Sequence, residues 1–248
     1  MTKITKPGPK PAKNTFGFMD EVGLLHSPST ERLFGLGLLK LHHPSELHKS
    51  IVNYKNKTGF HSEFKFANVS NSNLTLYKGF IDLFFDTKHS HFNSILFDKK
   101  NLDLKSYFRN NHHKAYNSFT SKLIAESLEA GEYIVVLADD LSTPKHDNFE
   151  KEVKKKVKVK ARRNALYGIC RLESHAVSEL QMADVLIGTV AYSFKIKYKV
   201  AGLNRKNAKF RLLVHLQNKL NTDYLAESHN YKAKYGIKFK INEFFDEK

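Results

Sequence analysis

The stretch EYIVVLADD, residues 132–140, has the densest run of β-branched residues in the chain and decides the fold class. A short, continuous apolar run of this kind predicts a central strand that is buried on both faces. The run ends on two adjacent carboxylates, Asp139 and Asp140. Because functional side chains of open α/β sheets collect at the ends of strands, this strand end is the first candidate for a site.

The segment NTFGFMDEVG, residues 14–23, repeats this pattern near the start of the chain. We expect a strand at 15–20 that ends on Asp20 and Glu21, with the apolar run at 32–41 as its hairpin partner. A chain rich in lysine has little reason to place paired acids at a strand end. The arrangement becomes favourable when a metal ion lies between the acids and an anionic partner.

Helices and strands alternate along the rest of the chain. Apolar periodicity, capping residues and glycine stops predict helices at 44–57, 70–86, 104–128, 148–164, 178–197 and 207–220. Further strands are predicted at 62–68, 91–98, 165–174 and 237–245. A hairpin followed by this alternation indicates an α/β fold with a mixed β-sheet flanked by helices. We expect a single domain at 15–248, with a basic C-terminal helix and a terminal strand, after a flexible basic arm at 1–14.

The bulk composition favours a nucleic-acid partner. The chain has 248 residues and a formal net charge of +16, from 41 basic and 25 acidic residues, and a field of this sign attracts polyanions. The longest apolar patch, at 183–194, is shorter than the about 20 residues that a membrane-spanning helix needs. The N-terminus lacks the apolar core of a secretory signal. These features predict a cytoplasmic protein that does not enter membranes.

Four acids form the candidate site: Asp20, Glu63, Asp139 and Asp184. Asp184 lies on the predicted helix 178–197, beside a stripe of apolar residues, and a carboxylate near the core is costly unless a cation or donors meet it. Converging carboxylates suit Mg²⁺ or Mn²⁺, which prefer oxygen ligands. Two such ions about 4 Å apart support phosphodiester hydrolysis. Lys65, two residues after Glu63 on the same predicted strand face, is expected to meet a phosphate.

Each of these acids also has a simpler interpretation. An isolated acid is more often a turn residue or a helix cap, and Glu21 and Asp140 can simply be solvated. Only the combination of acids at strand ends and on a buried helix indicates a metal site. His175, just before the same helix, is a further candidate for proton transfer or phosphate contact.

Several short motifs resemble, in chain order, those of the bacterial domain of unknown function 3800 family. They are FMDEVG at 18–23, EFKF at 63–66, VVLADD at 135–140 and ESHAVSELQMADVLIGTVAY at 173–192, and the closing IKFKINEFF resembles the family's terminal strand. The family pattern in the last long motif is Leu-Gln-x-Ala-Asp-x-x-x-Gly. Val22 departs from the pattern, since the family commonly has serine there, which puts a serine-assisted substrate contact in doubt.

The resemblance implies a ribonuclease H-like fold and metal-dependent nuclease chemistry. Carried over by position, it makes Asp20, Glu63, Asp139 and Asp184 an acidic tetrad, with Gln181 as a supporting donor one turn before Asp184. It also implies a place beside bacterial antiviral defence or mobile-element genes.

Two lysine- and arginine-rich runs, at 154–163 and 195–211, flank the Asp184 helix in the sequence. We expect them to form positive rims that lead a phosphate backbone across the acidic centre, although such runs are usually solvated faces. The residues chosen for this role are Lys155, Lys156, Arg162, Lys195, Lys199 and Arg205.

The function expected from these features is that of a metal-dependent phosphodiesterase acting on RNA or DNA, with a protein partner or homo-oligomer left open. The alternative is a non-catalytic nucleic-acid-binding or assembly module with a vestigial metal site.

Overall fold

The computed structural model describes residues 13–25, 32–139 and 148–244. The predicted arm at 1–14 falls mainly outside this part of the chain, and so does Asp140. The first strand runs from Lys13 to Val22, so it begins two residues earlier than expected and continues two residues beyond Asp20.

Within the described residues, seven strands form one sheet in the order β5-β4-β1-β2-β3-β7-β6. β1 and β2 form the predicted antiparallel hairpin, β3 continues it antiparallel, and β4 and β5 add in parallel on the other side of β1. β7 pairs parallel with β3, and β6 pairs antiparallel with β7. The strands are β1 Lys13–Val22, β2 Leu33–Leu41, β3 His91–Asp98, β4 Glu132–Asp139, β5 Leu166–Leu172, β6 His229–Lys232 and β7 Lys238–Phe244. The predicted α/β class with a mixed sheet is therefore confirmed.

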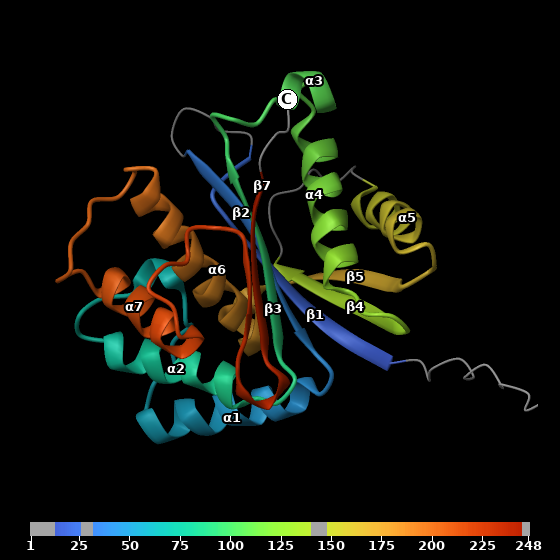
Figure 1. Cartoon of the computed structure of the whole chain (residues 1–248). Coiled ribbons are helices and arrows are strands. Elements are labelled where there is room, and N and C mark those ends of the chain that lie inside the picture. The colour runs from blue at the N-terminus through green and yellow to red at the C-terminus, as the bar shows by residue number, and fades with distance from the viewer. Residues whose placement is uncertain (1–12, 26–31, 140–147, 245–248) are drawn as a thin grey trace, which may run out of the picture.

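Helices cover both faces of the sheet (Figure 1). α4 and α5 pack on one face, while α1, α2, α6 and α7 pack on the other. The neighbours Phe18 and Met19 on β1 enter the two opposite cores, as the two-residue period of a strand requires. The helices are α1 Pro44–Thr58, α2 Leu74–Asp86, α3 Leu104–Phe108, α4 His112–Ser127, α5 Phe149–Ala161, α6 Ser178–Lys197 and α7 Ala208–Leu220.

The predicted strand at 62–68 is wrong, because this segment is irregular and ends in a short 3-10 turn, η1, at Phe66–Asn68. The backbone N–H groups of Phe64 and Phe66 donate to the side chains of Gln181 and Asp184 on α6. They therefore make side-chain bonds in place of ladder bonds with a neighbouring strand. Phe64 is anchored in a cluster of aromatic rings and is fully buried.

The predicted helix at 104–128 is divided into α3 and α4. Arg109 and Asn110 adopt left-handed backbone angles, with φ of 51° and 58°, which end α3. Asn111 then caps α4, since its side chain accepts a hydrogen bond from Lys114 N.

Two elements have the expected bounds but a different environment. α6 matches the predicted 178–197, yet it is buried on all sides from Glu179 to Phe194, with Asp184 as the one partly exposed residue in that span. A helix packed between a sheet and other helices does not need a polar face. β4 alternates between buried and partly exposed residues and is not buried on both faces, because it lies one strand from the sheet edge.

Candidate acidic site

Asp20 and Asp139 lie side by side, at or near the C-terminal ends of two parallel strands. β1 and β4 pair with Met19 opposite Ala138, so the next residues of the two strands are Asp20 and Asp139. Asp20 is only 8% exposed, and its Oδ1 accepts a hydrogen bond of 2.7 Å from Glu21 N. The parallel pairing thus brings together two acids that are 119 positions apart in the sequence.

Asp184 approaches this strand edge from α6, which packs on β1 and β2. Its Oδ2 accepts a 2.7 Å hydrogen bond from Phe66 N, which fixes the carboxylate against η1. Asp184 and Asp20 repel one another electrostatically, and Asp139 acts on both. Glu63 also acts on Asp184, so all four predicted acids are linked electrostatically.

Glu63 is connected to Asp139 through Ser174. The Ser174 hydroxyl donates to Glu63 Oε1 at 2.8 Å, while Ser174 N donates to Asp139 Oδ1 at 3.2 Å. Lys65 Nζ lies 3.3 Å from Glu63 Oε2, so Lys65 forms an ion pair with this acid. The sequence analysis did not single out Ser174, although it lies in the motif at 173–192, because a loop serine has no periodic signal of its own.

Gln181 holds the two acid-bearing loops in place. Its Oε1 accepts from Phe64 N and from Lys55 Nζ, both at 3.1 Å. Its Nε2 donates to the carbonyl oxygens of Ser174 and His175, at 3.2 and 3.3 Å. This buried amide therefore links the segment that carries Glu63 to the loop that contacts Asp139, in keeping with the supporting role expected for it.

Burial and like charge oppose ionisation at the centre of the site. Burial, and then the neighbouring charge of Asp184, raise the pKa of Asp20 well above its usual range. Burial also raises the pKa of Asp184 to about 6, with Glu63 and Asp139 adding to the shift, while Phe66 N and Lys65 oppose it. The carboxylates are therefore held together at a cost in folding free energy.

Glu21 belongs to the opposite face of the sheet from Asp20. It hydrogen-bonds the partly buried Tyr116 of α4, and burial raises the pKa of Glu21 to about 7. Its Oε2 is buried and has no hydrogen-bond partner within the described residues. Glu21 is therefore not a solvated neighbour of Asp20, and Tyr116 is a partner that the sequence did not suggest.

The donor chemistry of the tetrad fits a hard divalent cation, since all four side chains are carboxylates. Their present separation is wider than a ready chelate: within the described residues, no three His, Cys, Asp or Glu side chains are grouped so that they could hold a metal ion. Asp20, Glu63, Asp139 and Asp184 are thus suitable ligands that would have to draw closer around a bound ion.

His175 lies at the rim of the site in the 3-10 turn Ser174–Ala176, of which Ser174 is buried and His175 is exposed. Its Nδ1 is 3.4 Å from Glu173 Oε2, and both side chains are exposed. The backbone carbonyl oxygen of His175 accepts a hydrogen bond from Gln181, and this bond connects His175 to the acids.

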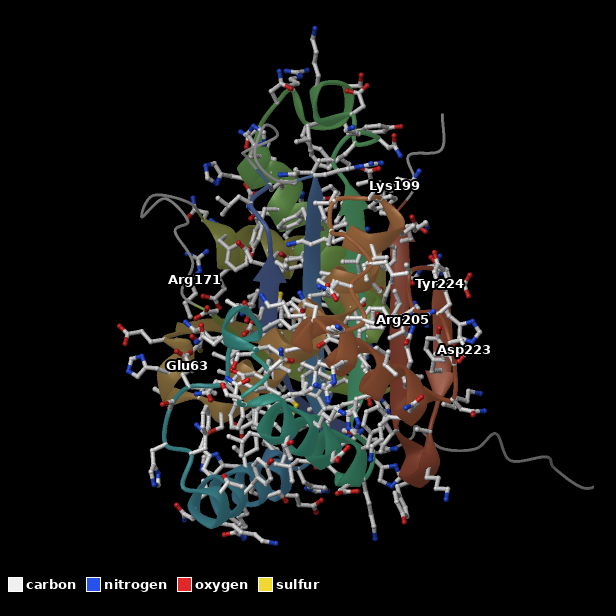
Figure 2. All side chains as sticks on the ribbon, turned by 90° about the vertical axis from the view of Figure 1, so that its left-hand side faces the viewer. Glu63, Arg171, Lys199, Arg205, Asp223 and Tyr224 are labelled. Atoms are coloured by element: carbon white, nitrogen blue, oxygen red, sulfur yellow. The ribbon has the colours of Figure 1, made fainter. Side chains whose placement is uncertain are left out.

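The two basic runs lie on opposite faces of the sheet and not along one groove. Lys155, Lys156 and Arg162 belong to α5 and its C-terminal cap, on the α4 side. Figure 2 shows Lys199 and Arg205 on the side of α6 and α7, away from Glu63. The first basic run lies mainly on α5, and this helix packs against α4 and β5.

Lys209 is the basic residue of the second run that approaches the acids, although it was not among the predicted contacts. Its Nζ lies 5.1 Å from the centre of the Phe66 ring, whose backbone binds Asp184. Burial and then Lys195 lower the pKa of Lys209, while Asp184 opposes the shift. Lys209 therefore brings positive charge towards Asp184, and Lys195, further along α6, lies near Lys209.

Comparison with known proteins gives no family assignment, since no protein-family model matches the chain. No curated protein matches it either. Among the described residues, no helix is long and apolar enough to cross a membrane. The fold and the site define an α/β protein with a mixed seven-stranded sheet in its described part and a cluster of acids at the ends of two parallel strands.

Proposed function

We propose that this chain is a metal-dependent phosphodiesterase that cuts RNA or DNA. The observation that carries the proposal is the mutual repulsion of Asp20, Asp139 and Asp184 in a largely buried site. Such an arrangement lowers the stability of the folded protein, and a divalent cation would reverse that effect.

The fold proposed with this function is ribonuclease H-like. It is supported by the strand order, in which an antiparallel β1-β2-β3 unit is extended in parallel by β4 and β5. The acids on β1 and β4 are then adjacent, and α6 adds a third. The motif resemblance to the domain of unknown function 3800 family supports the same fold, and with it a bacterial defence or mobile-element setting in the cytoplasm.

The residues that would hold Mg²⁺ or Mn²⁺ are Asp20, Glu63, Asp139 and Asp184. The ion would lower the pKa of a bound water and stabilise the leaving oxygen. Ser174 and Gln181 orient the carboxylates through the hydrogen bonds described above. Lys65, Lys195 and Lys209 provide positive charge for the phosphate on the α6 side of the sheet.

Cleavage of labelled RNA and DNA, single-stranded and duplex, with Mn²⁺ tests the proposal. Asp20→Asn and Asp184→Asn keep the shape and the hydrogen-bond acceptor but remove the charge, and each is expected to lower the rate at least about 100-fold. Asp223→Asn, at an exposed site away from the acids, is the matched control. Unchanged cleavage in both site variants would contradict the assignment of the tetrad.

The second candidate function is a nucleic-acid-binding or assembly module without catalysis. It is favoured by the separation of the acids, which in the described residues do not already form a metal-holding group. Calorimetric titration with Mn²⁺, followed by nucleic-acid binding in EDTA, distinguishes the two. Tight nucleic-acid binding without measurable metal affinity would favour the binding module.

A further inference from the structure

A cavity of about 740 Å³ lies between α4 and α5, on the face of the sheet opposite Asp184. It extends along α5 from Asn148 to Lys160, which corresponds to about 18 Å at the rise of an α-helix. Its wall is completed by Ser118 and Lys114 of α4. The cavity is therefore an elongated groove built by two helices.

The groove is strongly basic. Glu152 is the one acid among the residues that line it, and Asn117 Nδ2 holds Glu152 Oε2 at 3.1 Å. Five lysines line it: Lys114, Lys151, Lys155, Lys156 and Lys160.

Lys156 lies close enough to Lys160 and Lys114 to be repelled by both. Burial lowers the pKa of Lys156, and Lys160 and Lys114 lower it further, while Glu152 opposes the shift. Lysines on a simple solvated helix face avoid this crowding by pointing into water. Here, lysine side chains from both helices line one concave surface, so a chain of phosphates lying along it could reach several of them.

We propose that the α4–α5 groove binds the phosphodiester backbone of a nucleic acid, at a site separate from the acidic cluster. An anion with one phosphate would meet only one end of a groove about 18 Å long, whereas a chain of phosphates can engage lysines along its full length. Lysine acts as a flexible point charge, which suits a backbone read without regard to sequence. The proposal does not depend on catalysis, since binding in this groove requires no metal.

Binding of a fluorescein-labelled 20-nucleotide single strand, measured by anisotropy in EDTA between 50 and 200 mM salt, tests the groove. The variant Lys151→Gln/Lys155→Gln/Lys160→Gln removes three exposed charges along α5. We expect the slope of log affinity against log salt to flatten by about 2, at about 0.7 for each lost contact, and affinity to fall at least about tenfold.

The matched control is Lys49→Gln/Lys57→Gln/Lys88→Gln, which removes the same charge from exposed positions on the other side of the sheet. We expect the slope of log affinity against log salt to change by less than about half a unit in this control variant. Equal slopes for the two triple variants would overturn the proposal, because only the net charge would then matter. Displacement of the strand by tripolyphosphate at equal phosphate concentration would also overturn it, in favour of a compact polyphosphate ligand.

Hydrolysis of bis(p-nitrophenyl) phosphate with Mn²⁺ separates this proposal from the proposed function. The groove variant should hydrolyse this small ester at the wild-type rate, because it is too short to reach from the acids to the groove. If the hydrolysis rate of the groove variant fell by the same factor as its affinity for the single strand, the lysines would belong to the acidic site. The proposal of a separate groove would then be overturned. Absence of hydrolysis in the wild type would count against the nuclease, while the salt slopes would still decide the groove.

Discussion

Asp184 is held in a position where burial and two neighbouring acids oppose its charge. The unfolded chain releases this proton near pH 3.8, the usual value, whereas the folded chain releases it near pH 6. Below pH 3.8 the Asp184 carboxyl is protonated in both the folded and the unfolded state, so it does not lower the free energy of unfolding. As pH rises through the window between the two pKa values, the folded state becomes progressively less stable, and above pH 6 the full cost is present.

Asp184→Asn is therefore expected to stabilise the metal-free protein at neutral pH. The gain in free energy of unfolding should be near zero at pH 4, grow up to pH 6 and then stay constant, at up to about 3 kcal/mol. Urea denaturation in EDTA at several pH values measures it. Asp223→Asn should show no pH-dependent difference from the wild type, and a destabilised Asp184→Asn at pH 7.5 would contradict the repulsion.

The site residues divide into those that the sequence could reveal and those that it could not. Asp20 and Asp139 end recognisable apolar runs, and Asp184 interrupts an apolar helix, so local pattern is enough to select them. Ser174 and Tyr116 gain their roles from contacts 111 and 95 residues away, with Glu63 and Glu21. Such roles depend on the tertiary packing and leave no trace in a local window.

At the scale of elements, the contact between α6 and η1 positions the segment that carries Glu63. Gly188, one turn after Asp184, lies against Phe66 so closely that an added Cβ would be 2.3 Å from Phe66 Cγ. Phe66 is the residue whose backbone N–H binds Asp184. The absence of a side chain at this position therefore sets how closely the segment carrying Glu63 approaches the helix.

Gly188→Ala should destabilise the protein by up to about 2 kcal/mol, because overpacking costs about 1 to 3 kcal/mol and alanine recovers about 1 kcal/mol of this in a helix. It should also lower metal-dependent cleavage, because Phe66 and the carboxylate bound to it must shift. Urea denaturation and the cleavage assay measure the two effects. Gly202→Ala, where nothing lies within 4 Å of the added carbon, should change stability by less than about 0.5 kcal/mol.

If Gly188→Ala proved as stable and as active as the wild type, close packing of η1 on α6 would not position the acid.

The elements with strong periodicity were predicted from the sequence, and those fixed by long-range contacts were not. The β1–β2 hairpin and the bounds of α6 follow from apolar runs bounded by turn residues. The segment 62–65 alternates like a strand, but Gln181 and Asp184 occupy its N–H donors. β6, at His229–Lys232, is short and polar and exists because β7 offers it an edge. Pattern alone could not reveal these outcomes.

At the scale of the whole molecule, the sheet separates two basic surfaces. One borders the acids through Lys195 and Lys209, and the other is the α4–α5 groove. The net charge of +16 predicts a polyanionic partner, but only the sheet topology shows that the lysines lie on two faces. A single nucleic-acid strand could contact both basic surfaces only by passing around the edge of the β-sheet.

A ligand that binds only the folded protein stabilises the whole molecule against unfolding. Mn²⁺ at about 100 times its Kd should add about 2.7 kcal/mol to the free energy of unfolding. For a protein of this size, that gain raises the melting temperature by about 5 to 10 °C. Differential scanning fluorimetry with a manganese titration measures the shift.

The shift should require the acids, because the relief of their repulsion is its source. Asp184→Asn should therefore melt higher than the wild type in EDTA but gain little from Mn²⁺, whereas Asp223→Asn should gain as much as the wild type. An equal gain in Asp184→Asn would place the ion elsewhere on the chain. A wild type that gains nothing at millimolar Mn²⁺ would contradict a metal site at the acids and would favour the second candidate function, a module without catalysis.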